Sequence, residues 1–291
     1  MKTLLEMLRY KRPEGSQTQK YFCDAFLKPV FGNPDQFGNY ILTIGDSGLC
    51  FTAHHDTVHA TVGMQAVSVC DGFAMTSGES NCLGADCTTG VWLILGMIKA
   101  GIEGTYIVHA GEEIGCIGSR GIADSLPPWL ASIDAVISFD RRGTDSIVTH
   151  QCGYRTASDA FAESLSLALD IPELKPDDSG LYTDSESYAG IVPECTNVSV
   201  GYYGQHSKAE KQDLRFAEYL LESLISADWD SLVIQRNPGE DSPDSYTTDS
   251  LESFVYENPD VVAEYLDSFG ITIQDILQEQ NNINLYLERM A

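Results

Sequence analysis

The feature that most limits the fold of this chain is a series of short apolar segments separated by helical patterns. Strand-like segments lie at 40–44, 48–53, 66–70, 72–76, 105–110, 134–139, 146–150 and 195–200, and helical patterns at 87–100, 158–170 and 211–226. Continuously apolar strands that alternate with helices predict a largely parallel sheet buried on both faces. We therefore predict an α/β fold, with a mostly parallel twisted sheet and helices on both faces. An antiparallel hairpin at 66–76 would make the sheet mixed.

The composition changes near residue 237. The stretch 239–291 contains twelve acidic residues and one arginine, and 237–250 is rich in Pro, Ser and Asp. Asn258 followed by Pro259 is a typical start of a helix. We predict a main domain over 1–236, an acidic linker over 237–250 and a small acidic helical appendage over 251–291.

Polar side chains of one chemical kind follow the apolar segments at the points where the strands should end. They are His54 and Asp56 after 48–53, Glu112 and Glu113 after 105–110, Asp140 after 134–139, and His206 after 195–200. Asp86 directly precedes the helix predicted from residue 87. Ligands of open α/β sheets bind beyond the carboxyl ends of the strands, so we expect these side chains to meet there.

The collected side chains are the imidazoles and carboxylates that zinc accepts. A pair of zinc ions needs two histidines and three carboxylates, one of which bridges both ions, and a further carboxylate can act as a base. Five residues fill the ligand places: His54, Asp86, Glu113, Asp140 and His206. Glu112 is then left over as the base.

Several stretches together resemble the co-catalytic zinc peptidases of clan MH, above all the single-domain aminopeptidases. They are AHHDTV (53–58), LGADCTTG (83–90), AGEEIGCIGSRG (110–121), ISFDRRG (137–143), YYGQHSKAE (202–210) and, more loosely, TDSESYAGIVP (183–193). The resemblance implies a zinc-exopeptidase-like three-layer sandwich and a metallopeptidase that removes N-terminal residues from peptides.

The resemblance also assigns the ligands in pairs. His54 and Asp140 would hold one zinc, Glu113 and His206 the other, and Asp86 would bridge them. Co²⁺ or Mn²⁺ would fit the same ligands. A cis peptide after the bridging aspartate is common in the family. The stretch LGADCTTG (83–90) departs from the family at Cys87, where a second acidic residue is usual. We expect Cys87 to be a small buried thiol.

Other roles follow from the same resemblance. Glu112 would be the general base, and Asp56 would hold the imidazole of His54 in its ligating orientation. By their position in the sequence, Asp184 and Glu186 are candidates for binding the substrate amine, and Tyr202 and Tyr203, just before His206, for contacting the oxyanion of the substrate.

The net charge of −26 bears on the partners of the chain. It argues against nucleic acids and anionic membranes, and it suits metal ions and the amino termini of peptides. No export signal or membrane span is visible, so we expect a cytoplasmic protein whose eight cysteines are reduced. The acidic appendage could bind a protein partner, and the oligomeric state is left open.

Two alternatives to an aminopeptidase stay open. A carboxypeptidase, dipeptidase or N-acyl amino acid deacylase of the same clan would use the same metal centre. However, the stretch between Asp140 and His206 is too short for the lid domain that supplies an arginine in those enzymes. The second alternative is a catalytically inactive binding module that acts through its acidic tail.

Overall fold

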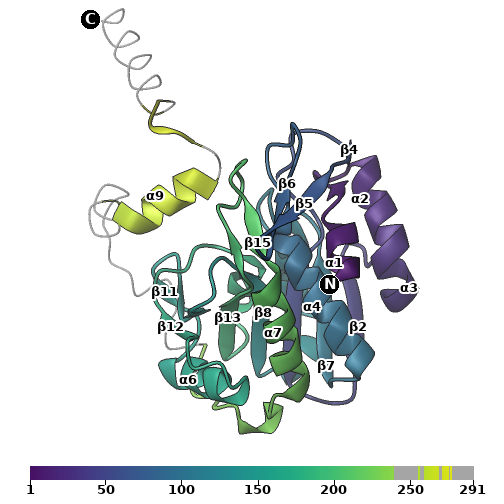
Figure 1. Cartoon of the computed structure of the whole chain (residues 1–291). Coiled ribbons are helices and arrows are strands. Elements are labelled where there is room, and N and C mark those ends of the chain that lie inside the picture. Colours follow the sequence, from purple (N-terminus) through teal and green to yellow (C-terminus); the bar gives the residue numbers. More distant parts are fainter. Residues whose placement is uncertain (239–254, 256–258, 269–270, 275, 277–291) are drawn as a thin grey trace, which may run out of the picture. The chain divides into compact units, whose positions relative to one another are not determined.

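The computed structural model describes residues 1–238, 255, 259–268, 271–274 and 276 (Figure 1). The chain divides into two compact units, Met1–Ser245 and Tyr246–Ala291. In the second unit, helix α9 spans Pro259–Ser268 and begins at the predicted proline. Most of the predicted linker and much of the predicted appendage lie outside the described residues, so those boundaries stay predictions.

The first unit is built on a mixed sheet of seven strands. In spatial order they are β12 (Lys175–Asp177), β9 (Ser146–Val148), β13 (Glu194–Ser199), β8 (Ala135–Arg141), β3 (Leu49–His54), β7 (Gly104–His109) and β2 (Tyr40–Ile44). The central strands β13, β8, β3 and β7 run parallel to one another. Their carboxyl ends therefore lie along one edge of the sheet, as predicted.

The mixed character of the sheet has a different origin from the one predicted. Strand β2 is antiparallel to β7, and β9 pairs antiparallel with β13 at one position. The hairpin of β5 (Val67–Cys70) and β6 (Phe73–Thr76) forms as predicted, but it belongs to a second sheet with β15 (Lys211–Asp213) and β14 (Tyr202–Tyr203).

The helix predicted from residue 211 begins three residues later, because the first three residues of that segment form a strand of the second sheet. Residues Lys211–Asp213 pair with β6 as a strand. The carboxylate of Asp213 then accepts hydrogen bonds from the backbone N–H groups of Arg215 and Phe216 and caps α7 (Leu214–Ser226). The cap and the strand pairing together fix where the helix starts.

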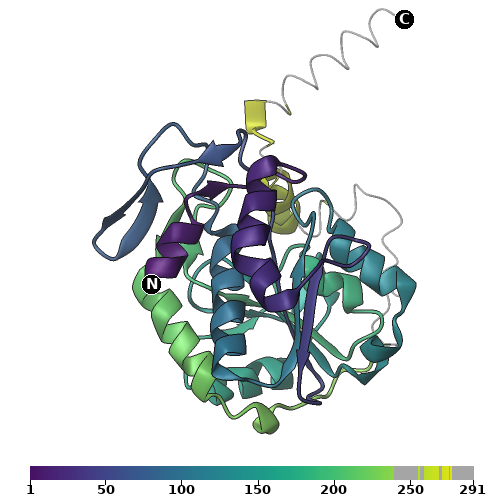
Figure 2. The same ribbon diagram turned by 90° about the vertical axis from the view of Figure 1, so that its right-hand side faces the viewer.

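Helices cover both faces of the main sheet (Figure 2). On one face α4 (Ala85–Ala100) packs on β3 and β8, beside α7 and α1 (Lys2–Met7). On the other face the 3₁₀ helix η3 (Asp184–Tyr188) contacts β3, β8 and β13, and α5 (Ile117–Ser125) packs against η3. Neighbouring residues of one strand enter different cores, Phe51 on the α4 side and Cys50 on the η3 side. The predicted three-layer arrangement is confirmed.

Shorter elements complete the unit. They are β1 (Tyr10–Lys11) paired with β4 (Gly63–Met64), α2 (Gln17–Phe22), the π-helix Cys23–Leu27, α3 (Lys28–Phe31), the 3₁₀ helices Pro128–Ser132 and Trp229–Ser231, β10 (His150–Gln151) paired with β11 (Tyr154–Arg155), and α6 (Asp159–Ala168). All eight cysteines are free, as predicted. Among the described residues, no helix is long and apolar enough to cross a membrane.

Helix α4 lies so close to the sheet that only glycine fits at position 90. A β-carbon there would stand 2.2 Å from the backbone oxygen of Phe139 and 2.5 Å from Sγ of Cys87. Because the backbone cannot move aside, we expect Gly90→Ala to lower the free energy of unfolding by about 1–3 kcal/mol, measured by urea denaturation. Gly96→Ala is the control, since its added carbon meets only the flexible side chain of Leu221. Equal stability of the two variants would contradict the prediction.

Candidate metal centre

One aspartate lies between two histidines at the carboxyl edge of the main sheet. Oδ1 of Asp86 is 3.1 Å from Nε2 of His54, and Oδ2 is 3.2 Å from Nε2 of His206. His54 ends β3, Asp86 stands in the irregular first turn of α4, and His206 follows β14. Each oxygen of one carboxylate thus faces a different imidazole, which is the arrangement that a bridging ligand requires.

Two further carboxylates extend the cluster on opposite sides. Oε2 of Glu113 is 3.2 Å from Nε2 of His206, and Oδ1 of Asp140 is 3.5 Å from Nε2 of His54. The structure therefore brings together all five predicted ligands, in the two predicted pairs that share Asp86. Asp86, Glu113 and His206 also offer ligand atoms within 4.8 Å of one another.

The charges of the cluster favour a bound cation. Burial raises the pKa of Glu113 to about 7, and the neighbouring charge of Asp86 acts in the same direction. Burial alone would lower the pKa of His206, but Glu113 and Asp86 raise it to about 12. Within the described part of the chain, the buried Oε1 of Glu113 has no hydrogen-bond partner. Imidazole nitrogens and carboxylate oxygens gathered in this way are the ligand types that zinc accepts, and a bound cation would take the place of the shared protons.

Glu112 stands beside the cluster without joining a ligand pair. Its Oε2 is 3.9 Å from Nε2 of His54, and the thiol of Cys116 lies 3.8 Å from its Oε1. Burial raises the pKa of Glu112 well above its ordinary value, and the charges of Asp140 and Glu113 raise it further. A carboxyl group in this position can exchange protons with a molecule held at the cluster.

Asp56 holds two parts of the site in place. Its fully buried carboxylate lies 3.3 Å from Nδ1 of His54 and accepts hydrogen bonds from the backbone N–H groups of Glu112, at 3.2 Å, and Glu113, at 3.0 Å. Although burial raises the pKa of Asp56, the contacts with His54 outweigh it and lower the pKa. Asp56 therefore orients the imidazole and the loop of the two glutamates together.

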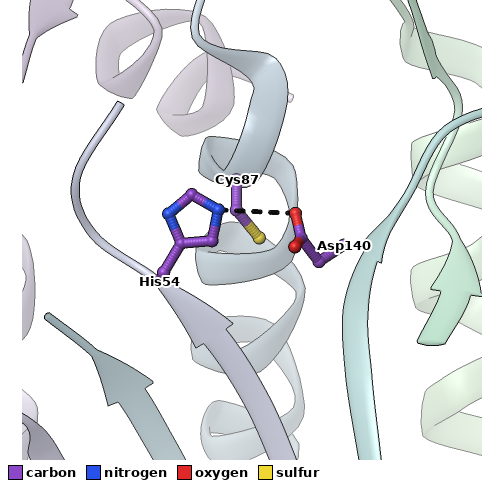
Figure 3. Close-up of side chains that lie close together, drawn as sticks. All are labelled: His54, Cys87 and Asp140. Atoms are coloured by element: carbon purple, nitrogen blue, oxygen red, sulfur yellow. Dashed lines mark ion pairs between the residues drawn. The ribbon is translucent and has the colours of Figure 1, made fainter. Parts of the chain in front are cut away.

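Cys87 lies next to His54 and Asp140 (Figure 3). Its thiol donates a hydrogen bond of 3.1 Å to the backbone oxygen of Phe139, and burial raises its pKa well above the ordinary value. Cys87 is fully buried, as expected for a small packed side chain, although its Sγ also lies within 4.8 Å of ligand atoms of His54 and Asp140. The peptide bond between Asp86 and Cys87 is cis, as the resemblance implies.

The candidates for substrate binding differ in their surroundings. Asp184 is buried at the start of η3, and its Oδ1 has no hydrogen-bond partner among the described residues. Burial raises the pKa of Asp184 to about 8. The hydroxyl of Tyr203 instead lies 3.4 Å from Oγ1 of Thr144. It is Tyr202 that donates to the backbone oxygen of Asp140, at 2.9 Å.

Two residues that the sequence interpretation did not assign also contact the cluster. The hydroxyl of Thr183 donates a 2.8 Å hydrogen bond to Oδ2 of Asp140. The buried carboxylate of Glu210 binds the backbone just before Asp86. A threonine before an aspartate and a glutamate in a polar loop carry no pattern of their own. Only their place in the stretches 183–193 and 202–210 associates them with the site.

The sheet with helices on both faces forms a three-layer α/β architecture, and the cluster lies at the carboxyl ends of its central strands. No protein-family profile matches the chain, and no curated protein is similar to it in sequence. The comparison of structures does find neighbours. They include proteins named as aminopeptidases and a tripeptidase, and also one named as an endoglucanase.

Three of these solved structures show the extent of the likeness. Aminopeptidase PepT from Bacillus cereus has a TM-score of 0.61 and 16% sequence identity, with 77% of this chain and 96% of that chain covered. A tripeptidase from Staphylococcus aureus has a TM-score of 0.63 and 14% identity, with 77% and 95% covered. An aminopeptidase from Desulfurococcus kamchatkensis has a TM-score of 0.60 and 13% identity, with 77% and 94% covered. At such identities the likeness establishes the shared fold, as the sequence resemblance predicted.

Proposed function

We propose that the protein is a metal-dependent aminopeptidase that binds two divalent cations, preferably zinc. The observation that carries the proposal is the carboxylate of Asp86, whose two oxygens face His54 and His206 at 3.1 and 3.2 Å. The solved aminopeptidases that share the fold support the same reaction class.

The ligands divide into two sets that share one residue. His54 and Asp140 would hold one cation, Glu113 and His206 the other, and Asp86 both. Two bound cations would supply Lewis-acid chemistry: a lower pKa for water and polarisation of the scissile carbonyl. The chain itself supplies the fixed geometry, because Asp56 orients His54 and the Glu113 backbone.

Glu112 would move the proton. It is close to His54 but belongs to neither ligand set, so its carboxylate is available to the attacking water. It takes the proton of that water as the new C–O bond forms, and it returns the proton to the leaving nitrogen as the C–N bond breaks. The oxygen and protons of one water are then distributed between the two products.

Asp184 would recognise the free amino terminus. Its Oδ1 has no hydrogen-bond partner among the described residues, and its charge raises the pKa of Glu112, so the carboxyl group lies close to the proposed base. The acidic composition of the chain would also attract positively charged amino termini.

A comparison of blocked and unblocked substrates tests the proposal. The zinc-loaded protein should hydrolyse an amino-acid anilide with a free amine, and it should leave the N-acetylated anilide uncleaved. Asp184→Asn should raise KM for the free amine about 10- to 100-fold because it removes a charge-assisted hydrogen bond. Asp178→Asn, which alters an exposed aspartate in the same loop, is the control.

The other outcomes identify the alternatives. Cleavage of the acetylated substrate alone would exclude an aminopeptidase. Absence of hydrolysis with both substrates in the metal-loaded protein would also refute the proposal, and it would leave the enzymes that need a free substrate carboxylate and the binding module as the alternatives. Deletion of 239–291 would then show whether the acidic segment carries the binding.

A further inference from the structure

A single buried carboxylate binds four consecutive backbone N–H groups beside the metal centre. Oε2 of Glu210 accepts hydrogen bonds from Leu83, at 2.7 Å, and Gly84, at 2.9 Å. Oε1 accepts from Ala85, at 2.7 Å, and Asp86, at 3.2 Å. The side chain is 1% exposed, so water does not replace these contacts.

The two segments that Glu210 joins both belong to the metal centre. The N–H groups lead directly into Asp86, the carboxylate shared by both ligand pairs. Glu210 itself follows His206 by four residues, in the loop between β14 and β15.

The backbone of this turn is shaped for an anion. Gly84 has a left-handed conformation with φ of +72°, and a β-carbon there would stand 2.7 Å from Cε1 of His59. Successive N–H groups that converge in such a turn form a concave site for negative charge. A glutamine cannot satisfy it, because its amide offers one acceptor oxygen where the carboxylate offers two.

We infer that Glu210 is a positioning residue that fixes Asp86 relative to His206 and thereby sets the affinity of the chain for its metal pair. The inference rests on the proposed two-metal site and extends it to a residue that touches neither metal nor substrate. Partners of this kind commonly contribute a factor of about 10 to 100 to metal affinity.

A matched control lies at the amino ends of the central strands, opposite the metal centre. Glu194, at the amino end of β13, is also fully buried and accepts hydrogen bonds from the backbone N–H groups of Ser158, Gln235 and Arg236. Its loss removes a comparable set of buried contacts, but it leaves the carboxyl edge of the sheet unchanged.

The experiment titrates Zn²⁺ into the metal-free wild type, Glu210→Gln and Glu194→Gln in competition with a chelator of known affinity. We expect two Zn²⁺ per wild-type chain, an affinity about 10- to 100-fold weaker in Glu210→Gln, and wild-type affinity in Glu194→Gln. Thermal unfolding of the metal-free proteins, measured in parallel, should show that both variants lose stability.

Each result has a distinct meaning. A wild type that binds no metal pair would refute the proposed function itself. A wild type that binds two ions together with an unchanged affinity in Glu210→Gln would overturn only the inference. An equal loss of affinity in Glu194→Gln would overturn it too, because a general loss of stability would then suffice. If Glu210→Gln does not fold, Glu210→Asp, which keeps the charge but shortens its reach, carries the same test.

Discussion

Replacement of Glu112 by glutamine is expected to reduce turnover by about 10²- to 10⁴-fold while both metal ions stay bound. Glutamine keeps the shape of the side chain but cannot accept the proton of the attacking water. Glu112 belongs to neither ligand pair, and its nearest cluster contact is 3.9 Å from His54. Steady-state hydrolysis of a free-amine anilide, with elemental analysis of the same preparation, measures both effects.

Glu113, the next residue in the chain, provides the comparison variant, because it is a proposed metal ligand and Glu112 is not. Glu113→Gln alters the ligand that faces His206 at 3.2 Å, so it should lose metal as well as activity. The assignment of roles within the pair would be wrong if Glu112→Gln hydrolysed peptides normally. It would also be wrong if the two variants lost metal equally.

Replacement of Asp86 by asparagine is expected to remove the metal pair. The two oxygens of the carboxylate face the two imidazoles, whereas an amide presents an oxygen to one side and an N–H group to the other. We expect at most one ion per chain and a loss of activity at least as large as in Glu112→Gln. Elemental analysis after dialysis against Zn²⁺ checks the number of ions.

Thermal unfolding gives a second measure of the same variant. A ligand that binds only the folded state at a thousand times its Kd stabilises that state by about 4 kcal/mol. Excess Zn²⁺ should therefore raise the Tm of the wild type and raise that of Asp86→Asn much less. A variant with two ions and a wild-type response to zinc would show that Asp86 is not the shared ligand.

The main sheet could be predicted from the sequence because its central strands are rich in apolar residues. Strands β3, β7, β8 and β13 are buried along almost their whole length, which favours apolar side chains on both faces. The hairpin of β5 and β6 was assigned to the wrong sheet because its pairing partner, Lys211–Asp213, lies far along the chain. Local patterns indicate that a segment is a strand, but they do not identify a partner so distant in sequence.

The short helices could not be predicted for a related reason. Helix α5 has the sequence IGSRGIADS, in which two glycines weaken the helical pattern and half-exposed or exposed apolar residues blur the buried face. The segments α2, Cys23–Leu27 and α3 are each too short for a full apolar period. Tertiary packing, more than local preference, determines these elements.

The residues of the candidate site also fall into a group that could be predicted from the sequence and a group that could not. His54, Asp140 and the two glutamates could be located because they end apolar strands, where chemistry-bearing side chains are expected. Glu210 and Thr183 could not, because they act through hydrogen bonds to backbone or to another side chain. Their residue types are common on any surface, and only the folded backbone shows what they contact.

The shared aspartate and its two histidines come from segments that are synthesised at very different times. His54 and Asp86 leave the ribosome well before His206 and Glu210. A nascent chain that stops short of residue 206 lacks one of the two histidines that face Asp86. If the chain binds the proposed metal pair, loading with both ions would therefore follow synthesis of the β14–β15 loop, and termination before that loop would leave the proposed centre incomplete.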